Sequence, residues 1–445
     1  MDLPKYQTGF ALILFIVGLF ITSASIVGGA FYLKANHPSL VNKLSSIPKH
    51  KPITPKSQPG VTQIKKDPTP PLLPPGLDQK FVSAQNNFSF KLFQELVKVD
   101  SLKNIFISPS GISLALSMVY QGALDQTKDA LTQTLNIQDI FKEDLNKNNQ
   151  DLLNILKSTD PKVEISVANS IWGKKDIKFN QDFIDTNQKY YQAQVKNLDF
   201  TQPNAAATIN NWVKENTKNK IAQIVSSPFP KNTVLYLINA VYFKGIWTKE
   251  FDKKLTKDQD FTAANKLKKQ HPMMEQKGTF KYLENDDFQA IDLPYGQEGR
   301  FSMYLFLPKY GLKQFTATLS AQSWNGWMEE FRETEGTIIL PKFKMEYEKE
   351  LKNPLINLGM GIAFGAKANF DNLAKDIYLS TVKQKTYIEV SEEGINASGV
   401  SSMQTPDKAA KPFSIQINKP FFFAVRDNRL ETILFMGIIN DPKLT

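Results

Sequence analysis

Side chains that could catalyse a reaction or bind a metal are scarce in this chain, and their spacing matches no common catalytic arrangement. The absence of cysteine excludes thiol nucleophiles, zinc ribbons, iron–sulfur sites and disulfides. Of the three histidines, His37 and His50 lie in a proline-rich stretch, which leaves His271 alone in the rest of the chain. This is too few for a Ser-His-Asp triad within a folded domain or for a multi-histidine metal site. The sequence predicts a protein that is not an enzyme and that needs no cofactor or metal.

Two short motifs resemble functional signatures but are better explained as local structure. Ser108-Pro109-Ser110 has no histidine nearby in sequence to activate a hydroxyl, so we expect these hydroxyls to cap the start of a helix. Gly359-Met360-Gly361 lacks the spacing of a phosphate-binding loop and is typical of a packing turn. His271, as an isolated imidazole, is expected to have a structural or surface role.

The most informative segment runs from Thr386 to Pro420. It begins as a strand and passes through Glu392-Glu393-Gly394 into a stretch rich in small residues. When it is read with a period of two, one face is small or apolar and consists of Ile395, Ala397, Gly399, Ser401 and Met403. This alternation is typical of a strand with one buried face, whereas the Gly and Ser content suits a loop. A long segment without regular structure is usually functional, although a flexible loop with chance alternation is an equal alternative.

The elements that must position this segment are predicted to be helical first and extended later. A helix is expected within Asn86–Val99, and two more within Ser110–Leu135, separated near Gly122. Short apolar runs rich in β-branched and aromatic residues predict strands at Thr233–Phe243, Phe301–Leu307 and Gly336–Leu340, with two more around an Asp427-Asn428-Arg429 turn. Helices followed by strands indicate an α+β fold.

The formal net charge of +10 is concentrated at the N-terminus. Residues 1–80 hold nine lysines and three aspartates, a net charge of +6, so the rest of the chain is nearly balanced. Nucleic-acid binding is therefore not expected. Two lysine clusters, Lys253, Lys254, Lys257 and Lys266, Lys268, Lys269, could bind a polyanion, but a solvated surface is the preferred interpretation.

The first 80 residues predict a membrane attachment and a spacer. After a short segment at 1–8, residues 9–33 carry no charge, and as a helix they would span roughly 37 Å, against ~30 Å for a hydrocarbon core. We expect a single-pass anchor, with a cleaved signal peptide and secretion as the alternative. Residues 34–80 contain ten of the 25 prolines and predict a disordered, extended linker to a domain at 81–445.

Several segments spread through residues 81–445 match one known family in the same order. SEEGINASG resembles the hinge of a reactive loop, and INKPFFFAVRDNRLETILFMGIINDP resembles a C-terminal signature. The others are NIFISPSGISLALSMVYQGA, ANSIWGKKDIKFNQDFI, INNWVKENTKNKI, LINAVYFKGIWTKEF and HPMMEQKGTFKY. On these segments the chain resembles the serpins, which are serine protease inhibitors. The resemblance implies helices packed on a large, mostly antiparallel sheet plus smaller sheets, with an exposed reactive loop.

The resemblance also implies a mechanism and its residues. A protease cleaves the loop, remains attached as an acyl-enzyme, and is distorted when the loop inserts as an extra central strand in the large sheet. The implied hinge comprises Glu392, Glu393, Gly394, Ile395, Ala397 and Gly399. The implied shutter beneath the sheet comprises Ser108, Ser110, Asn239 and Gln384, and insertion would begin at the breach beside Trp247.

Three residues depart from the family pattern, and one count places the scissile bond. Ile395 replaces a usual Thr or Ser, Asn396 a common Glu, and Gln384 a shutter histidine. Counting from Glu392 by the family rule places the reactive bond between Lys408 and Ala409, and a lysine there predicts a trypsin-like target. The expected protein is a monomeric inhibitor that forms a covalent protease complex outside the cell membrane. The alternatives are a non-inhibitory serpin or a membrane-tethered binding protein.

Overall fold

The computed structural model describes residues 77–157, 160–394 and 411–444. The chain divides into two units, Met1–Asp67 and Pro68–Thr445, and every described residue belongs to the second. The predicted anchor at 9–33 and almost all of the predicted linker lie outside the described residues. Within the described ranges, no helix combines the length and the apolar character that a bilayer crossing requires.

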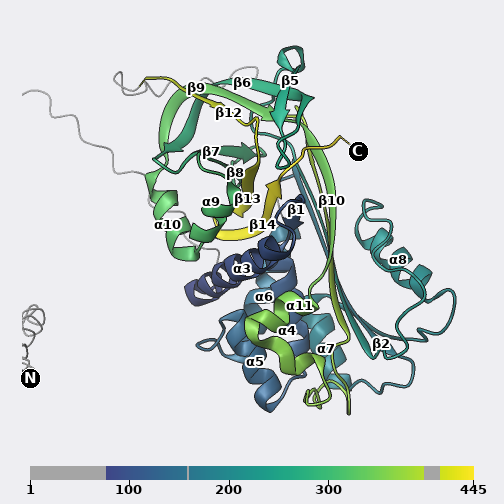
Figure 1. Ribbon diagram of the computed structural model, residues 1–445. Coiled ribbons are helices and arrows are strands. Elements are labelled where there is room, and N and C mark those ends of the chain that lie inside the picture. Colours follow the sequence, from purple (N-terminus) through teal and green to yellow (C-terminus); the bar gives the residue numbers. More distant parts are fainter. Residues whose placement is uncertain (1–76, 158–159, 395–410, 445) are drawn as a thin grey trace, which may run out of the picture. The chain divides into compact units, whose positions relative to one another are not determined.

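The helices gather mainly in the N-terminal half of the described chain (Figure 1). In order they are α3 (Gln79–Val99), α4 (Pro109–Tyr120), α5 (Asp125–Leu135), α6 (Lys142–Lys157), α7 (Gln181–Tyr191), α8 (Ala205–Asn216), α9 (Leu312–Thr318), α10 (Ala321–Glu330) and α11 (Lys352–Leu355). Short turns of helix follow at η1 (Lys253–Leu255), η2 (Ile356–Met360) and η3 (Gly361–Phe364). Apart from α3 and α6, these helices are short enough to need packing for stability, since isolated helices of this length are marginal in water.

A five-stranded sheet contains the strand that leads into the informative segment. Its order is β10-β11-β4-β2-β3, formed by β10 (Phe343–Glu350), β11 (Thr381–Val390), β4 (Leu235–Gly245), β2 (Val163–Lys174) and β3 (Gln194–Leu198). The outer pairing β10–β11 and the pairing β4–β2 are antiparallel, whereas β11–β4 and β2–β3 are parallel. This sheet is therefore mixed.

A nine-stranded sheet forms the other half of the fold. Its path is β1-β14-β13-β8-β7-β6-β9-β12, with β5 paired to β6. The strands are β1 (Ile105–Ile107), β5 (Lys257–Thr262), β6 (Lys268–Glu284), β7 (Phe288–Tyr295), β8 (Phe301–Pro308), β9 (Arg332–Pro341), β12 (Phe413–Gln416), β13 (Phe421–Asp427) and β14 (Thr432–Ile439). All of its pairings except β12–β9 are antiparallel.

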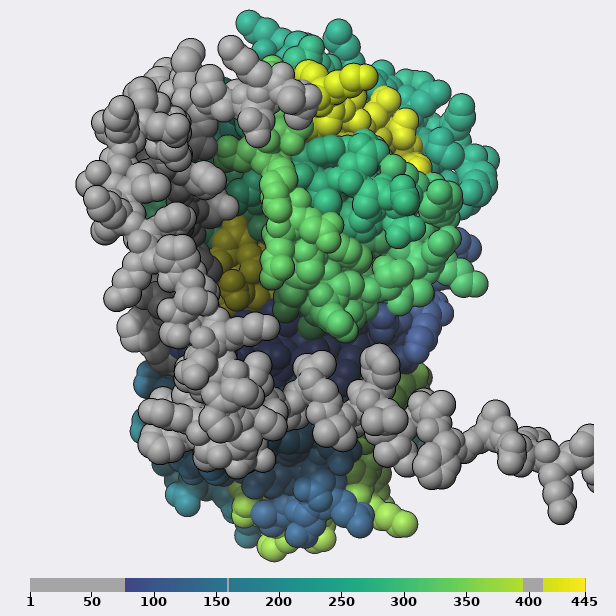
Figure 2. Space-filling model, turned by 90° about the vertical axis from the view of Figure 1, so that its left-hand side faces the viewer, coloured from purple at the N-terminus to yellow at the C-terminus, as the bar shows by residue number. Residues whose placement is uncertain are grey.

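The five-stranded sheet is covered on both faces. One face packs against α8 through a cluster that includes Trp172, Ile209 and Tyr242, and the other face packs against the helices around α4 (Figure 1). Figure 2 shows the purple residues of α3 as a band between the green region of α9, α10 and β9 above it and blue residues that include α5 below it. The main core is continuous from these helices into the nine-stranded sheet. Both faces of β4 are thus withdrawn from water, which fits its nearly unbroken apolar sequence.

Most of the predicted elements are confirmed, and one feature differs. The helix expected within Asn86–Val99 is α3, which starts earlier, at Gln79, where the Asp78 side chain accepts the Lys80 amide hydrogen bond. The strand expected at Thr233–Phe243 is β4. The larger sheet is mostly antiparallel, as expected, but the hinge belongs to the smaller, mixed sheet. Parallel pairing is possible here because a long crossover connects β4 and β11, which are far apart in sequence.

Candidate functional site

The β4–β11 seam is the part of the five-stranded sheet on which the expected site depends. We define it as the parallel pairing that runs from Tyr236 opposite Thr381 to Phe243 opposite Ile388. The two strands are direct neighbours, so no strand lies between them. β11 ends at Val390, and the chain then passes along the top of β4 as far as Gly394.

A buried polar network crosses the middle of the seam. Gln384 stands opposite Asn239, and its Nε2 donates to Asn239 Oδ1 at 2.5 Å and to the Ser108 carbonyl at 2.8 Å. Its Oε1 accepts from the Ser108 amide at 3.0 Å. The Ser108 and Ser110 hydroxyls donate to the carbonyl of Leu434 at 2.9 and 3.3 Å. The structure therefore brings together all four residues expected at the shutter.

Ser108 has a second role as the cap of α4. Its side chain accepts the amide hydrogen bond of Gly111 at 3.2 Å, and Pro109 follows at the first helical position, where a missing N–H costs nothing. A Cβ on Gly111 would lie 2.8 Å from Asn239 Oδ1, so this position has no room for a side chain. The cap thus holds the start of α4 directly against the seam.

Sequence reasoning missed Asn169, the fifth member of the network. Asn239 Nδ2 donates to Asn169 Oδ1 at 2.6 Å, which extends the network from β4 to β2. Asn169 could have been found in the sequence as an amide side chain within an apolar run, since a buried amide needs a hydrogen-bonding partner. The network therefore links β11, β4, β2 and the start of α4.

Trp247 anchors the chain at the top of the seam. Its amide donates to the Glu393 carbonyl at 3.0 Å, and its indole N–H donates to the Ser391 carbonyl at 2.8 Å. The indole is 3% exposed and stacks on Tyr295 with ring centroids 4.2 Å apart. Trp247 also forms an isolated parallel bridge with Gly394. The hinge backbone therefore already follows the edge of β4 before residue 395.

Glu392 is held by an ion pair in which the carboxylate is buried and the lysine is half-buried. Its carboxylate lies 2.7 Å from Lys342 Nζ and accepts a hydrogen bond from Thr256 Oγ1 at 2.9 Å. Burial acts to raise the pKa of Glu392, but the bonds from Lys342 and Thr256 outweigh it and hold the pKa below its ordinary value. Nothing in the sequence pattern indicated Lys342 or Thr256 as partners.

The other two hinge residues that the structure describes, Glu393 and Gly394, have contrasting surroundings. Glu393 is exposed and lies 3.5 Å from Lys244 Nζ, a pairing that contributes little in water. Gly394 has no room for a side chain, because a Cβ there would lie 2.1 Å from the Cα of Glu250. The glycine is therefore required by the close approach of two backbones.

The remaining predicted site residues, Ile395, Ala397, Gly399, Lys408 and Ala409, lie outside the described residues. The chain resumes at Lys411 and enters β12, which pairs in parallel with β9. His271 is 4% exposed, which argues against the surface alternative, and its Nε2 lies 2.5 Å from the Lys342 carbonyl oxygen. Within the described ranges, no three potential metal-ligating side chains come together.

Comparison with known proteins places this geometry in a family. The family model described as "Serpin (serine protease inhibitor)" matches residues 83–442. A leukocyte elastase inhibitor of Xenopus tropicalis is 34% identical over 81% of this chain and 99% of its own, and human neuroserpin is 31% identical over 80% and 90%. The native structure of the thermophilic serpin tengpin is 30% identical, with a TM-score of 0.74 over 82% of this chain and 95% of its own. The chain belongs to the serpin family, which is described as a family of serine protease inhibitors and not of enzymes.

Proposed function

We propose that the protein is a membrane-tethered suicide inhibitor of trypsin-like serine proteases. The observation that carries this proposal is the β4–β11 seam, in which two parallel neighbours are paired directly while the hinge leaves from their upper end. A strand entering between them would run antiparallel to both, so it would pair through the more favourable antiparallel ladders. The similarity to a leukocyte elastase inhibitor supports protease inhibition in general.

Insertion has a sufficient energetic driving force. About a dozen inserted residues would each add backbone hydrogen bonds worth ~0.5–1.5 kcal/mol. With burial of the small, apolar face that begins at Ile395, the gain is on the order of ten kcal/mol. The closed sheet is then metastable and persists for kinetic reasons.

Denaturing electrophoresis after mixing with trypsin tests the mechanism. An inhibitor of this kind yields a band at the summed mass of the protease and the 50.3 kDa chain, less a small C-terminal fragment. A binding protein or a non-inhibitory serpin yields no such band, which would refute the proposal. Ile395 makes the non-inhibitory alternative worth this test, because a larger side chain than the usual Thr or Ser must be buried at the first inserting position.

Two substitutions separate the hinge from the scissile bond. Ala397→Glu places a carboxylate on the inserting face, where its desolvation costs several kcal/mol and slows insertion relative to deacylation. The variant should be cleaved as a substrate, whereas Asn396→Glu, on the other face, should still form the complex. Lys408→Ala should weaken trypsin inhibition, and mass spectrometry should find a released fragment that begins at Ala409. A fragment that begins at another residue would show that the reactive bond lies elsewhere.

The membrane tether rests on the uncharged segment 9–33 and the proline-rich linker. An inhibitor of secreted or foreign proteases acts outside the membrane, so we place residues 81–445 there. Protease shaving of intact cells should remove this domain, and its release into the medium would instead indicate a cleaved signal. Protection until lysis would place the domain inside.

A further inference from the structure

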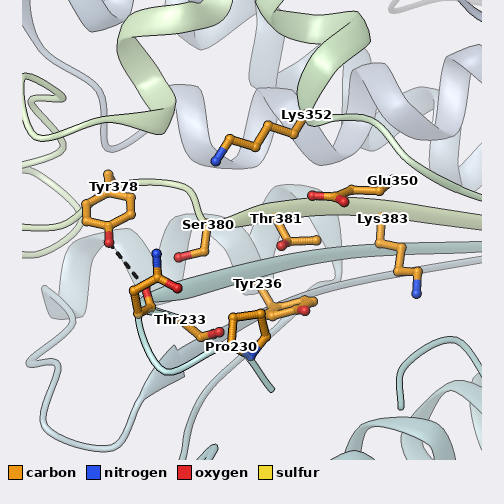
Figure 3. Close-up of a pocket in the computed structure, with 10 residues that line it drawn as sticks. Pro230, Thr233, Tyr236, Glu350, Lys352, Tyr378, Ser380, Thr381 and Lys383 are labelled. Carbon is orange, nitrogen blue, oxygen red and sulfur yellow. Dashed lines mark hydrogen bonds between the residues drawn. The ribbon is translucent and has the colours of Figure 1, made fainter. Parts of the chain in front are cut away.

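A small polar cavity lies at the lower end of the β4–β11 seam, at the opposite end from the hinge (Figure 3). Its volume is about 280 Å³, near the lower end of the range for ligand pockets and suited to a solute of few atoms. The walls come from Tyr236 on β4, Thr381 on β11, Glu350 at the end of β10 and Lys352 at the start of α11. The cavity therefore touches both strands that meet at the seam.

Two opposite charges in this cavity lack ion-pair partners in the described part of the chain. Neither Lys352 nor Glu350 has an oppositely charged side-chain atom within 4.0 Å, whereas the neighbouring Lys383 is bound to Glu348 at 2.6 Å. Lys352 Nζ lies 5.7 Å from the centre of the Phe364 ring, and in Figure 3 it extends over Ser380 towards Tyr378. The half-buried Lys352 and the exposed Glu350 thus stand at separate positions along the wall of a single pocket, which Lys383, the cross-strand neighbour of Glu350, also lines.

The uncharged polar groups of the pocket include Ser380, whose hydroxyl is available as a donor. Ser380 Oγ accepts the Val234 amide at 2.8 Å, so its own hydroxyl proton remains free to donate towards the cavity. The Tyr378 hydroxyl is occupied, because it donates to the Asn232 carbonyl at 3.2 Å. Burial raises the pKa of Tyr236, with a smaller contribution from the Glu350 carboxylate, which keeps this ring neutral beside the acid.

We propose that this cavity binds a small zwitterion whose carboxylate and ammonium are separated by a few bonds, such as a short peptide. The carboxylate would pair with Lys352 and accept from Ser380, and the ammonium would pair with Glu350. A simple anion would meet the unpaired carboxylate, and a simple cation would meet the unpaired ammonium, so either gains less than a molecule that carries both charges.

Such a ligand would bias the sheet towards its closed state. It lies against both Tyr236 on β4 and Thr381 at the start of β11, and an inserted strand would move these walls apart by a further ~4.8 Å. A ligand that binds only the closed arrangement stabilises it by mass action and slows strand insertion. This consequence, unlike binding itself, rests on the proposed inhibitory function.

Ligand-detected NMR on the full chain tests the binding step with glycylglycine, whose two charges are separated by more than one ~3.8 Å Cα spacing. Acetate and methylammonium are the single-charge controls. We expect glycylglycine to bind in the millimolar range and to bind about tenfold more weakly to Lys352→Met and Glu350→Gln, since each loses one charged contact. Lys313→Met, an exposed change on α9, should leave affinity unchanged.

Equal binding of acetate would overturn the zwitterion assignment, and undetectable binding, or binding that all three variants retain, would overturn the site. Melting curves of the variants confirm that each one is folded. In a second experiment, glycylglycine should slow formation of the trypsin complex by the wild type but not by Lys352→Met. Equal slowing of both proteins would overturn the effect of this site on insertion. If no complex forms even without ligand, the inhibitory function fails while the NMR result still decides the site.

Discussion

Gln384→Ala should strongly destabilise the closed sheet. The Gln384 side chain is 2% exposed and makes three hydrogen bonds, to the Ser108 amide, the Ser108 carbonyl and Asn239 Oδ1. The Ser108 carbonyl keeps a second donor in the Ile112 amide, so its loss is partly offset. Without Gln384, the Ser108 amide loses the acceptor that these bonds give it, and Asn239 Oδ1 loses its donor. Each unsatisfied buried group costs ~1–3 kcal/mol.

Adding the void left by the removed amide gives an expected loss of about 3 to 6 kcal/mol in the free energy that holds the closed fold. The midpoint of urea unfolding, followed by tryptophan fluorescence, measures this loss. The matched control is Glu389→Gln, a change on the same strand at an exposed position that keeps an acceptor for the Tyr387 hydroxyl. The control should stay within ~0.5 kcal/mol of wild type.

The same substitution should also shorten the lifetime of inhibitory activity on warming. The bond between Gln384 and Asn239 crosses the seam, and it must break before any strand can enter. Residual trypsin inhibition after timed incubation gives the rate of loss. If Gln384→Ala matches the Glu389→Gln control in both stability and lifetime, the polar network does not hold the seam closed, and the reasoning fails.

Three further predictions concern Glu392, His271 and Gly394. Because the pKa of Glu392 is lowered, its ion pair stabilises the fold at neutral pH, and this stabilisation is lost as the pH falls through the lowered pKa. The melting temperatures of wild type and Glu392→Gln should therefore converge in acid. Burial lowers the pKa of His271, which faces Lys269, Asp258 and Asp441. Because the unfolded chain then takes up this proton more readily, the fold should lose stability as the pH falls below the ordinary pKa of histidine, and His271→Gln should remove this loss. Gly394→Ala should cost on the order of 1–3 kcal/mol through the backbone clash, whereas Gly326→Ala, with open space around it, should be neutral or stabilising; equal effects would refute the steric argument.

Local sequence pattern was sufficient for most individual elements. The run Thr233–Phe243 is apolar and β-branched enough to predict β4 directly, and the Ser108-Pro109 pair predicts the start of α4. The resemblance to known hinge and shutter segments then predicted that Ser108, Asn239 and Gln384 meet. In the structure Gln384 accepts a hydrogen bond from the Ser108 amide and donates one to Asn239 Oδ1, so the three residues lie together.

The partners that complete the site could not be predicted, because they depend on which backbones approach one another. Lys342 is an ordinary lysine in sequence, and only the position of β10 beside the hinge makes it the partner of the buried Glu392 carboxylate. The need for glycine at position 394 likewise comes from the Glu250 backbone, more than a hundred residues earlier. Parallel pairing of β4 with β11 is also a property of the whole topology, since neither strand's sequence specifies its neighbour.

At the β4–β11 seam, the driving force for strand insertion and the barrier to it come from different groups. Backbone pairing between β4 and β11 would be replaced by two new ladders if a strand entered, so the backbone favours insertion. Side-chain contacts across the seam have no such replacement. They include the Gln384–Asn239 bond and the Tyr387–Tyr242 ring pair, whose centroids lie 5.6 Å apart, and both must be lost first. Substitutions of these side chains should therefore change how long the closed sheet survives, while backbone hydrogen bonding determines how much energy its opening releases.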